Sequence, residues 1–213
     1  MFPKSFQKLI KNFASLPSIG PKMAERLVLY LFKQDLEKIK EFAENLLEIK
    51  DMQTCSRCYN ISEDTLCSIC KDSKRDQKTI CVVEEPLDVI SIERTNTFRG
   101  VYHVLGGVLH ASEKTPDLKI QELLDRISSE KIEEVILATN PTTEGDATAF
   151  YLKRKLQSLE ATPVKSGEAG LPTTEFNGVK ITRLGRGLST GADLEYADEI
   201  TLSEALTNRK EIG

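Results

Sequence analysis

Residues 1–50 carry apolar side chains at the three- and four-residue spacing of amphipathic helices. A first helix is predicted around residues 6–13 and a second after Pro21, which suits the first turn of a helix. A third is predicted after Asp35, which can cap its N-terminus. The apolar faces of the first and third helices are Phe6, Leu9, Ile10 and Phe13, and Leu36, Ile39, Phe42, Ala43, Leu46 and Leu47.

Further along the chain, short apolar runs alternate with helical patterns. Strands are predicted at TICVVEE, VYHVLGGVL, EEVILAT and VKITRLG, and helices at PLDVISIERT, DLKIQELLDRI and DATAFYLKRKLQ. Residues 162–178 are expected to form a loop or hairpin, and TLSEALTNRK a short helix capped by Thr201. Such alternation predicts an α/β domain with a mostly parallel sheet, flanked by helices and joined by right-handed crossovers.

Four cysteines lie between these two parts in the pattern C-x2-C-x8-C-x2-C. Two thiolates from each C-x-x-C turn complete a tetrahedron around Zn²⁺, and closed ligation by four sulfurs favours a structural site. Two disulfides or a redox C-x-x-C are the alternatives. Disulfides fit poorly with a chain that shows no export signal, and a redox motif is not normally doubled at this spacing. The predicted zinc ligands are Cys55, Cys58, Cys67 and Cys70, whereas Cys81 in TICVV is expected to be a core thiol.

Charge is distributed unevenly along the 213 residues, whose formal net charge is −4. Residues 1–33 hold six basic side chains against Glu25 alone, a net charge of +5, so the remainder sums to −9. A basic head on an acidic body indicates an anionic partner for the head, or else only a solvated helix face. The start of the chain resembles no signal peptide and no apolar run approaches a membrane span, so a cytoplasmic protein is expected.

The turn LPSIGPK between the first two helices has the pattern of a helix-hairpin-helix. Backbone N–H groups around a glycine turn and the following helix N-terminus point at an anion such as a phosphate. Lys22 and Arg26 are four residues apart and therefore share one face of the second helix. Such a contact reads the nucleic-acid backbone and not its sequence. The alternative is an ordinary helical hairpin with solubilising lysines.

The stretch VILATNPTTEGDATAFY contains an expected strand that stops at Thr139 and a loop with Glu144, Gly145 and Asp146. Ligands of α/β proteins usually bind at the carboxyl ends of strands. Two acids beside a glycine there could hold a metal ion, dock a partner or only face solvent.

These motifs together resemble the bacterial RecR family of recombination mediators. The resemblance rests on LPSIGPKMAERL, the cysteine pattern, ICVVEEPLDVISIE, YHVLGGVL, ILATNPTTEGDATAFYL and ITRLGRGLSTGADLEYADEITLSEAL. It implies a helix-hairpin-helix region over 1–53, a C4 zinc finger over 54–75, a Toprim domain over 76–178 and a Walker B-like segment over 179–213. It also implies a ring-like tetramer that acts with RecO and RecF at gapped or damaged DNA and helps to load RecA.

The resemblance also assigns roles to residues. It implies DNA binding by Lys22 and Arg26, and the other lysines of the head, Lys4, Lys8 and Lys11, are expected to add to that contact. The glutamate of the NPTTEG loop, here Glu144, is associated with RecO contact. The chain departs from the family pattern in four places: Ser18 replaces a glycine, Gly185-Arg186-Gly187 replaces Ala-His-Gly, residues 162–178 are longer, and VLHASEKTP lacks a glycine-rich loop.

Toprim enzymes bind Mg²⁺ with a glutamate at one strand end and an Asp-x-Asp at another. Glu84 matches the first position, but the Asp-x-Asp position reads Asn140-Pro141-Thr142, which carries no charge. We therefore expect a non-catalytic, nucleoid-associated mediator, whose acids Glu84, Glu144 and Asp146 dock a basic partner or bind Mg²⁺ weakly. The alternatives are a Toprim-type nuclease, topoisomerase or primase, and a zinc-dependent adaptor that never touches DNA.

Two further motifs are not expected to carry chemistry. His103 and His110 are expected to be structural or surface residues. The stretch LEYADE resembles a Walker B strand, but the chain has no G-x-x-x-x-G-K-[ST] loop to cradle a phosphate. ATP hydrolysis is therefore not predicted, and this segment is expected to pack against a neighbouring subunit.

Overall fold

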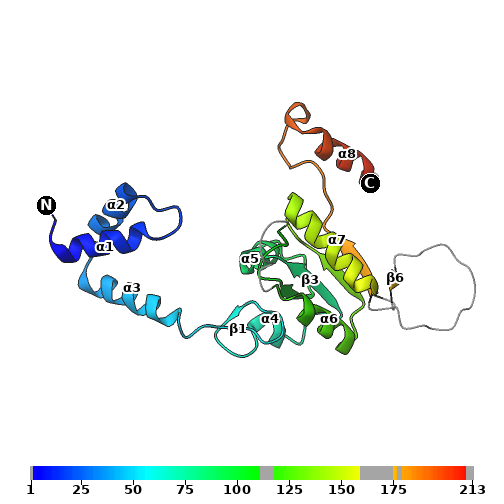
Figure 1. The fold of residues 1–213 in the computed structure, drawn as a ribbon, viewed down its shortest axis with the longest axis horizontal. Coiled ribbons are helices and arrows are strands. Elements are labelled where there is room, and N and C mark those ends of the chain that lie inside the picture. The colour runs from blue at the N-terminus through cyan, green and yellow to red at the C-terminus, as the bar shows by residue number, and fades with distance from the viewer. Residues whose placement is uncertain (1, 111–117, 159–174, 177–178, 210–213) are drawn as a thin grey trace, which may run out of the picture. The chain divides into compact units, whose positions relative to one another are not determined.

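The chain forms two units, one ending at Met52 and one beginning at Gln53 (Figure 1). The structure is a computed structural model, and it describes residues 2–110, 118–158, 175–176 and 179–209. Most of the predicted loop at 162–178 and part of VLHASEKTP lie outside the described residues.

Three helices make the first unit: α1 (Lys4–Ala14), α2 (Pro21–Phe32) and α3 (Leu36–Glu48). Ala24 and Val28 are its fully buried residues, and both face inward from α2. Asp35 stands at the N-cap position of α3 as expected, but its side chain accepts no capping hydrogen bond. The Asp35 carbonyl accepts the first intrahelical hydrogen bond, from the Ile39 N–H at 3.2 Å.

The turn between α1 and α2 contains a strained residue. Ser18 has a φ of 65°, in the left-handed region that residues other than glycine seldom occupy. The Ile19 N–H donates to the Leu16 carbonyl at 3.2 Å and closes the turn around it. The position where the resembled family usually has glycine is therefore one that requires a glycine-like backbone, and serine adopts it here.

A five-stranded sheet is the centre of the second unit, with the strand order β4-β3-β5-β7-β6. The first four strands are parallel, and the short β6 pairs with β7 in the antiparallel direction. The mostly parallel sheet is thus confirmed. Its strands are β3 (Thr79–Val83), β4 (Val101–Val104), β5 (Glu134–Leu137), β6 (Glu175–Phe176) and β7 (Val179–Arg183).

All four predicted strands were longer than the observed ones, and the second differs most. VYHVLGGVL extends only as far as Val104 because Gly106 and Gly107 turn away with φ values of 87° and 142°. The N–H groups of both glycines donate to the Glu84 carbonyl, at 2.9 and 3.0 Å. The chain after β4 is therefore bent over the end of β3.

Helices cover both faces of the sheet. Successive side chains along each strand point to opposite faces. Ile80 and Val82 pack against α6 (Ile120–Ser129) and α7 (Thr143–Ser158) on one face. Cys81 and Val83 pack against α5 (Pro86–Glu93) on the other. Cys81 is 2% exposed, which confirms it as a core thiol.

The remaining elements are short: β1 (Gln53–Thr54), β2 (Ile61–Ser62), α4 (Ser68–Lys71), the 3₁₀ helix η1 (Leu194–Tyr196) and α8 (Glu199–Thr207). The prediction that Thr201 caps α8 was wrong. Asp198 is the N-cap, and it accepts hydrogen bonds from the Thr201 N–H at 2.9 Å and hydroxyl at 2.8 Å. Among the helices that the structure describes, none has both the length and the apolar character needed to cross a bilayer.

Candidate functional site

The four predicted metal ligands come together at the tips of the two C-x-x-C turns. Cys55, Cys58, Cys67 and Cys70 are all buried, and their Sγ atoms lie within 4.8 Å of one another. The Cys58 and Cys67 Sγ atoms are 3.5 Å apart. Four sulfurs at about 2.3 Å from a tetrahedral Zn²⁺ require such separations, so the donor set fits this metal.

Hydrogen bonds prepare one of these thiols to bind a cation. Burial acts to raise the pKa of Cys55, but N–H groups of Cys67, Cys58 and Arg57 lower it to about 6. Burial raises the pKa of Cys67 to about 11, and a hydrogen bond with Cys70 together with burial raises that of Cys58. These pKa directions favour a thiolate at Cys55, and metal binding releases protons from Cys58 and Cys67.

The cysteine segment is fastened to the sheet along β4, which is an edge strand. The Val104 N–H donates to the Cys58 carbonyl at 2.8 Å. Tyr59, with a φ of 63°, places its ring edge-on to His103, with 5.3 Å between the ring centroids. His103 is fully buried, and its Nε2–H donates to the Lys119 carbonyl at 2.7 Å. His103 thus occupies a core position, whereas His110 is exposed.

Glu84 lies at the carboxyl end of β3, as expected, but its carboxylate is bound by the protein itself. It is 7% exposed. It accepts hydrogen bonds from the Asn140 N–H at 2.7 Å and from Asn140 Nδ2 at 2.5 Å. Asn140 thus offers N–H donors where a Toprim enzyme would offer a carboxylate.

The predicted loop with Glu144, Gly145 and Asp146 is instead the first turn of α7, which begins at Thr143. The Gly145 N–H donates to Thr142 Oγ1 at 3.1 Å, and the Thr139 hydroxyl donates to the Gly145 carbonyl at 2.8 Å. A Cβ at Gly145 would collide with the Asn140 carbonyl and would lie 2.8 Å from Glu84 Oε1. Glycine is therefore required here for close approach and not for an unusual φ.

Asp146 is held by two arginines, one at the end of β7 and one just after it. Arg183 and Arg186 each form an ion pair with Asp146 Oδ1. Burial acts to raise the pKa of Asp146, but the hydrogen bond from Arg186 and the charges of both arginines outweigh it and lower the pKa. The sequence singled out Arg186 only as a departure from the family pattern and did not predict this pairing.

The three acids do not gather into one cluster. Within the described residues, the cysteine group is the one set of three or more ligand side chains close enough to share a metal ion. Glu144 is exposed, and no ion pair or side-chain hydrogen bond of its carboxylate is found in that part of the chain. Of the three, Glu144 is therefore the acid that faces solvent most freely.

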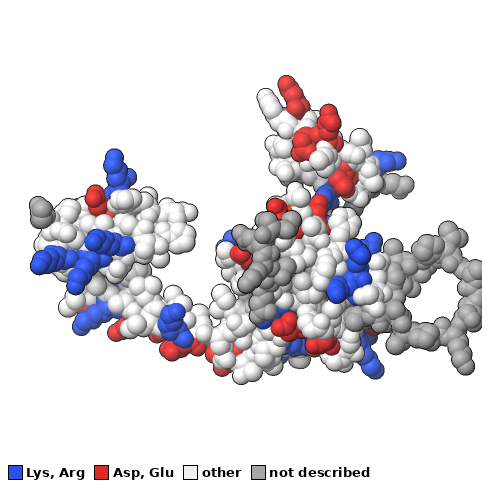
Figure 2. All heavy atoms as spheres, viewed as in Figure 1, with Lys and Arg blue, Asp and Glu red and all other residues white. Residues whose placement is uncertain are grey.

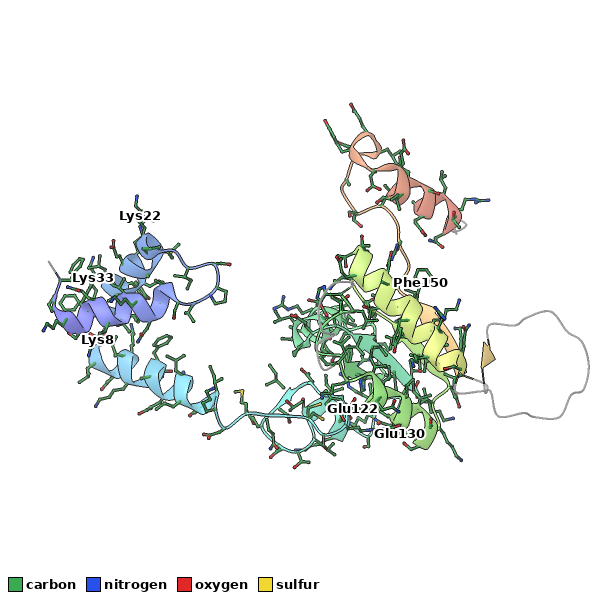
Figure 3. The ribbon with its side chains drawn as sticks, in the orientation of Figure 1. Lys8, Lys22, Lys33, Glu122, Glu130 and Phe150 are labelled. Atoms are coloured by element: carbon green, nitrogen blue, oxygen red, sulfur yellow. The ribbon has the colours of Figure 1, made fainter. Side chains whose placement is uncertain are left out.

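The basic side chains of the first unit are all exposed (Figure 2). Lys22 and Arg26 extend from the first turns of α2. Lys4, Lys8 and Lys11 recur at helical spacing on α1. Lys22 projects away from Lys8 and Lys33 (Figure 3), so the unit presents cations on more than one side. None of them forms an ion pair with any residue that the structure describes.

Comparisons with known proteins find matches to each region of the chain. Family models match a RecR helix-hairpin-helix at residues 6–50, a RecR four-cysteine zinc finger domain at 52–72, a Toprim domain at 78–165 and a RecR C-terminal region at 187–210. A protein named Recombination protein RecR from Chloroflexus aggregans is 49% identical over 208 residues, which are 96% of this chain and 93% of that one. Proteins of the same name from Herpetosiphon aurantiacus and Leifsonia xyli are 46% and 42% identical, over 99% and 100% of this chain and 96% and 100% of their own.

These matches confirm the resemblance and two structural predictions. The sheet with its flanking helices is a Toprim domain. The four buried cysteines, which lie in the matched zinc finger domain, form one structural zinc site.

Proposed function

The chain belongs to the RecR family of recombination proteins, and we propose that it is a DNA-binding mediator in recombinational DNA repair that catalyses no reaction itself. The observation that carries this proposal is the basic head, residues 1–33 of the first unit. Its six cations are exposed, and Glu25 is the one acid in this stretch of the sequence. Cations that no neighbour neutralises are free to displace the counterions of a phosphate backbone.

Lys22 and Arg26 form the main contact in this proposal. They lie at the N-terminal end of α2, where Pro21 occupies the first helical position. Backbone N–H groups and the helix dipole at this end favour an anion, and the two side chains one turn apart extend the contact along the strand. Lys4, Lys8 and Lys11 on α1 form a second, peripheral contact. Binding of this kind depends on salt and only weakly on base sequence.

The arrangement around Glu84 supports a role in holding DNA and partners rather than in cutting DNA. The position of the Asp-x-Asp motif is neutral, and Asn140 already binds both oxygens of Glu84. Asp146 is balanced by Arg183 and Arg186. A Toprim-type nuclease, topoisomerase or primase would need these carboxylates to be free for Mg²⁺.

Partners complete the proposed function. Glu144 is the proposed contact for RecO, because its exposed carboxylate suits a basic partner surface. We also propose that the protein acts with RecF, helps to load RecA and is cytoplasmic and nucleoid-associated. The proposed domain boundaries fall after residues 53, 75 and 178. A ring-like tetramer is also proposed. The exposed apolar side chains of the C-terminal segment support such an assembly: Leu194, Tyr196, Ile200 and Leu206.

A double variant tests the central claim. Lys22→Ala with Arg26→Ala is expected to weaken binding to a gapped duplex at least tenfold and to make binding less sensitive to salt. Lys38→Ala with Lys40→Ala removes the same charge from exposed positions of α3 and is the matched control. DNA bound by wild type should keep its strand lengths on a denaturing gel with Mg²⁺ present. Equal affinities for the two double variants would refute the hairpin contact, and shortened strands would refute the non-catalytic role.

A further inference from the structure

Helix α7 carries exposed side chains on the face that is turned away from the sheet. Its inner face, which includes Leu152 and Leu156, is buried in the sheet core. Phe150 on the outer face is 64% exposed. Figure 3 shows Phe150 projecting from α7. A whole aromatic ring is therefore available to a partner on this face.

Two cations lie beside this ring. Lys153 and Arg154 are three and four residues after Phe150, so they share its side of the helix, and both are exposed. No acid lies three or four residues from either of them in the sequence. Neither forms an ion pair with any residue in the described ranges. Figure 2 shows basic side chains gathered over the C-terminal half of α7.

These cations differ from others in the same unit. Many are neutralised locally, as Arg75 is by Glu93 and Lys180 by Glu134. Lys155, the next residue on α7, lies over the Tyr151 ring at 5.6 Å from its centroid. Favourable interaction with the helix dipole explains a cation in the last turn of a helix, but it does not explain an exposed ring beside two unpaired cations.

We propose that Phe150, Lys153 and Arg154, the α7 stripe, form a second nucleic-acid contact that is selective for single strands. The exposed ring can stack on an unpaired base, and the two cations can bind the phosphates on either side of it. A duplex offers the ring no free base face, because its bases are stacked on one another. This inference rests on the proposed DNA-binding function and adds a contact on the Toprim domain to the one in the first unit.

A tryptophan reporter tests the contact directly, because the chain contains no tryptophan. Full-length Phe150→Trp is titrated with labelled oligothymidylate while the anisotropy of the label reports binding. Stacking is expected to quench the tryptophan emission as the anisotropy saturates, and a blunt duplex is expected to leave the emission unchanged. Leu87→Trp is the control, because Leu87 is 68% exposed on α5, against the opposite face of the sheet.

Each other outcome overturns the inference. Unchanged emission at saturating anisotropy means that the α7 stripe does not contact DNA, although the mediator proposal would stand. Emission that depends on protein concentration without DNA means that the stripe is a contact between subunits. The absence of any anisotropy change overturns both this inference and the proposed function.

Two further variants separate stacking from charge. Phe150→Leu keeps an apolar side chain without a stacking ring and is expected to bind the oligonucleotide about tenfold more weakly, with duplex affinity unchanged. Lys153→Ala with Arg154→Ala is expected to reduce the slope of log affinity against log salt by about 1.4. Lys74→Ala with Lys131→Ala removes the same charge from exposed positions and should leave the slope unchanged. Identical slopes for the two double variants would contradict the role of charge.

Discussion

Arg57, in the first cysteine turn, and Glu130, just after α6, are joined by two parallel hydrogen bonds. Nε donates to Oε1 at 3.0 Å and Nη2 donates to Oε2 at 2.8 Å. Arg126 donates to the same carboxylate at 3.2 Å. Burial acts to raise the pKa of Glu130, but these arginines lower it. The zinc finger is thus tied to the Toprim domain by a shared carboxylate as well as by the β4 backbone.

Glu130→Gln is expected to lower the free energy of unfolding by about 1–3 kcal/mol, because three charge-assisted hydrogen bonds lose their ionised acceptor. Denaturation in urea measures the change. Glu133→Gln is the matched control, since Glu133 pairs with Lys78 where both side chains are more than half exposed, and it should cost less stability than Glu130→Gln. Equal losses of stability in the two variants would contradict the role of the Glu130 carboxylate in tying the zinc finger to the Toprim domain.

Elemental analysis is expected to find one zinc per chain. Cys58→Ser should lower this content and the stability together, because Cys58 supplies a sulfur ligand, and loss of the metal loosens the turn whose Cys58 carbonyl accepts the Val104 N–H. Cys81→Ala removes a buried thiol from the sheet core, outside the cysteine group, and should retain the full zinc content. A folded Cys58→Ser protein of unchanged melting temperature would show that the metal does not support the domain.

Ser18→Gly is expected to stabilise the first unit by about 0.5–1 kcal/mol. The left-handed conformation costs an L-residue about 1–2 kcal/mol, and the greater freedom of glycine in the unfolded chain returns part of that gain. Thermal unfolding followed by circular dichroism measures the effect. Ser15→Gly is the control, because Ser15 has ordinary helical angles and glycine there should destabilise. Destabilisation by Ser18→Gly would show that the serine is held by an interaction that compensates for its strain.

Stability is expected to fall as the pH is lowered from 7 to 5. Burial lowers the pKa of His103 to about 4, so the unfolded chain, with an ordinary histidine pKa near 6.5, takes up a proton first. The loss from this residue is about 2 kcal/mol at pH 5 and stops growing below the folded pKa. His103→Gln, which can still donate to the Lys119 carbonyl, should unfold with a shallower pH dependence over this range. Parallel pH profiles of the two proteins would exclude His103 as the titrating group.

Local spacing was enough to predict the zinc ligands, the three N-terminal helices and the alternation of strands and helices. The predictions failed where partners distant in sequence decide the structure. Glu84 and Asn140 are 56 residues apart, and Arg186 and Asp146 are 40 apart. No local pattern could show that these groups satisfy one another, so the acids were expected to be open.

The boundaries of elements depended on details of turns. Thr142 accepts the Gly145 N–H, and this starts α7 earlier than the alanine-rich pattern suggested. The N-cap of α8 is Asp198, which precedes the apolar positions of the helix. The prediction placed the N-cap three residues too late, at Thr201. The shortening of β4 followed from positive φ values at Gly106 and Gly107, which the letters of VYHVLGGVL allow but do not require.

The hydrogen bond from Val104 to the Cys58 carbonyl has a consequence for the life of the protein in the cell. An uncovered outer strand is a template on which other chains can add by strand pairing, and natural proteins avoid leaving such strands bare. Here the cysteine turn occupies part of that template. Zinc shortage would then do more than destabilise the zinc finger, because it would expose the edge of β4 and favour self-association into insoluble aggregates. Zinc supply would in this way set the amount of usable protein as well as its fold.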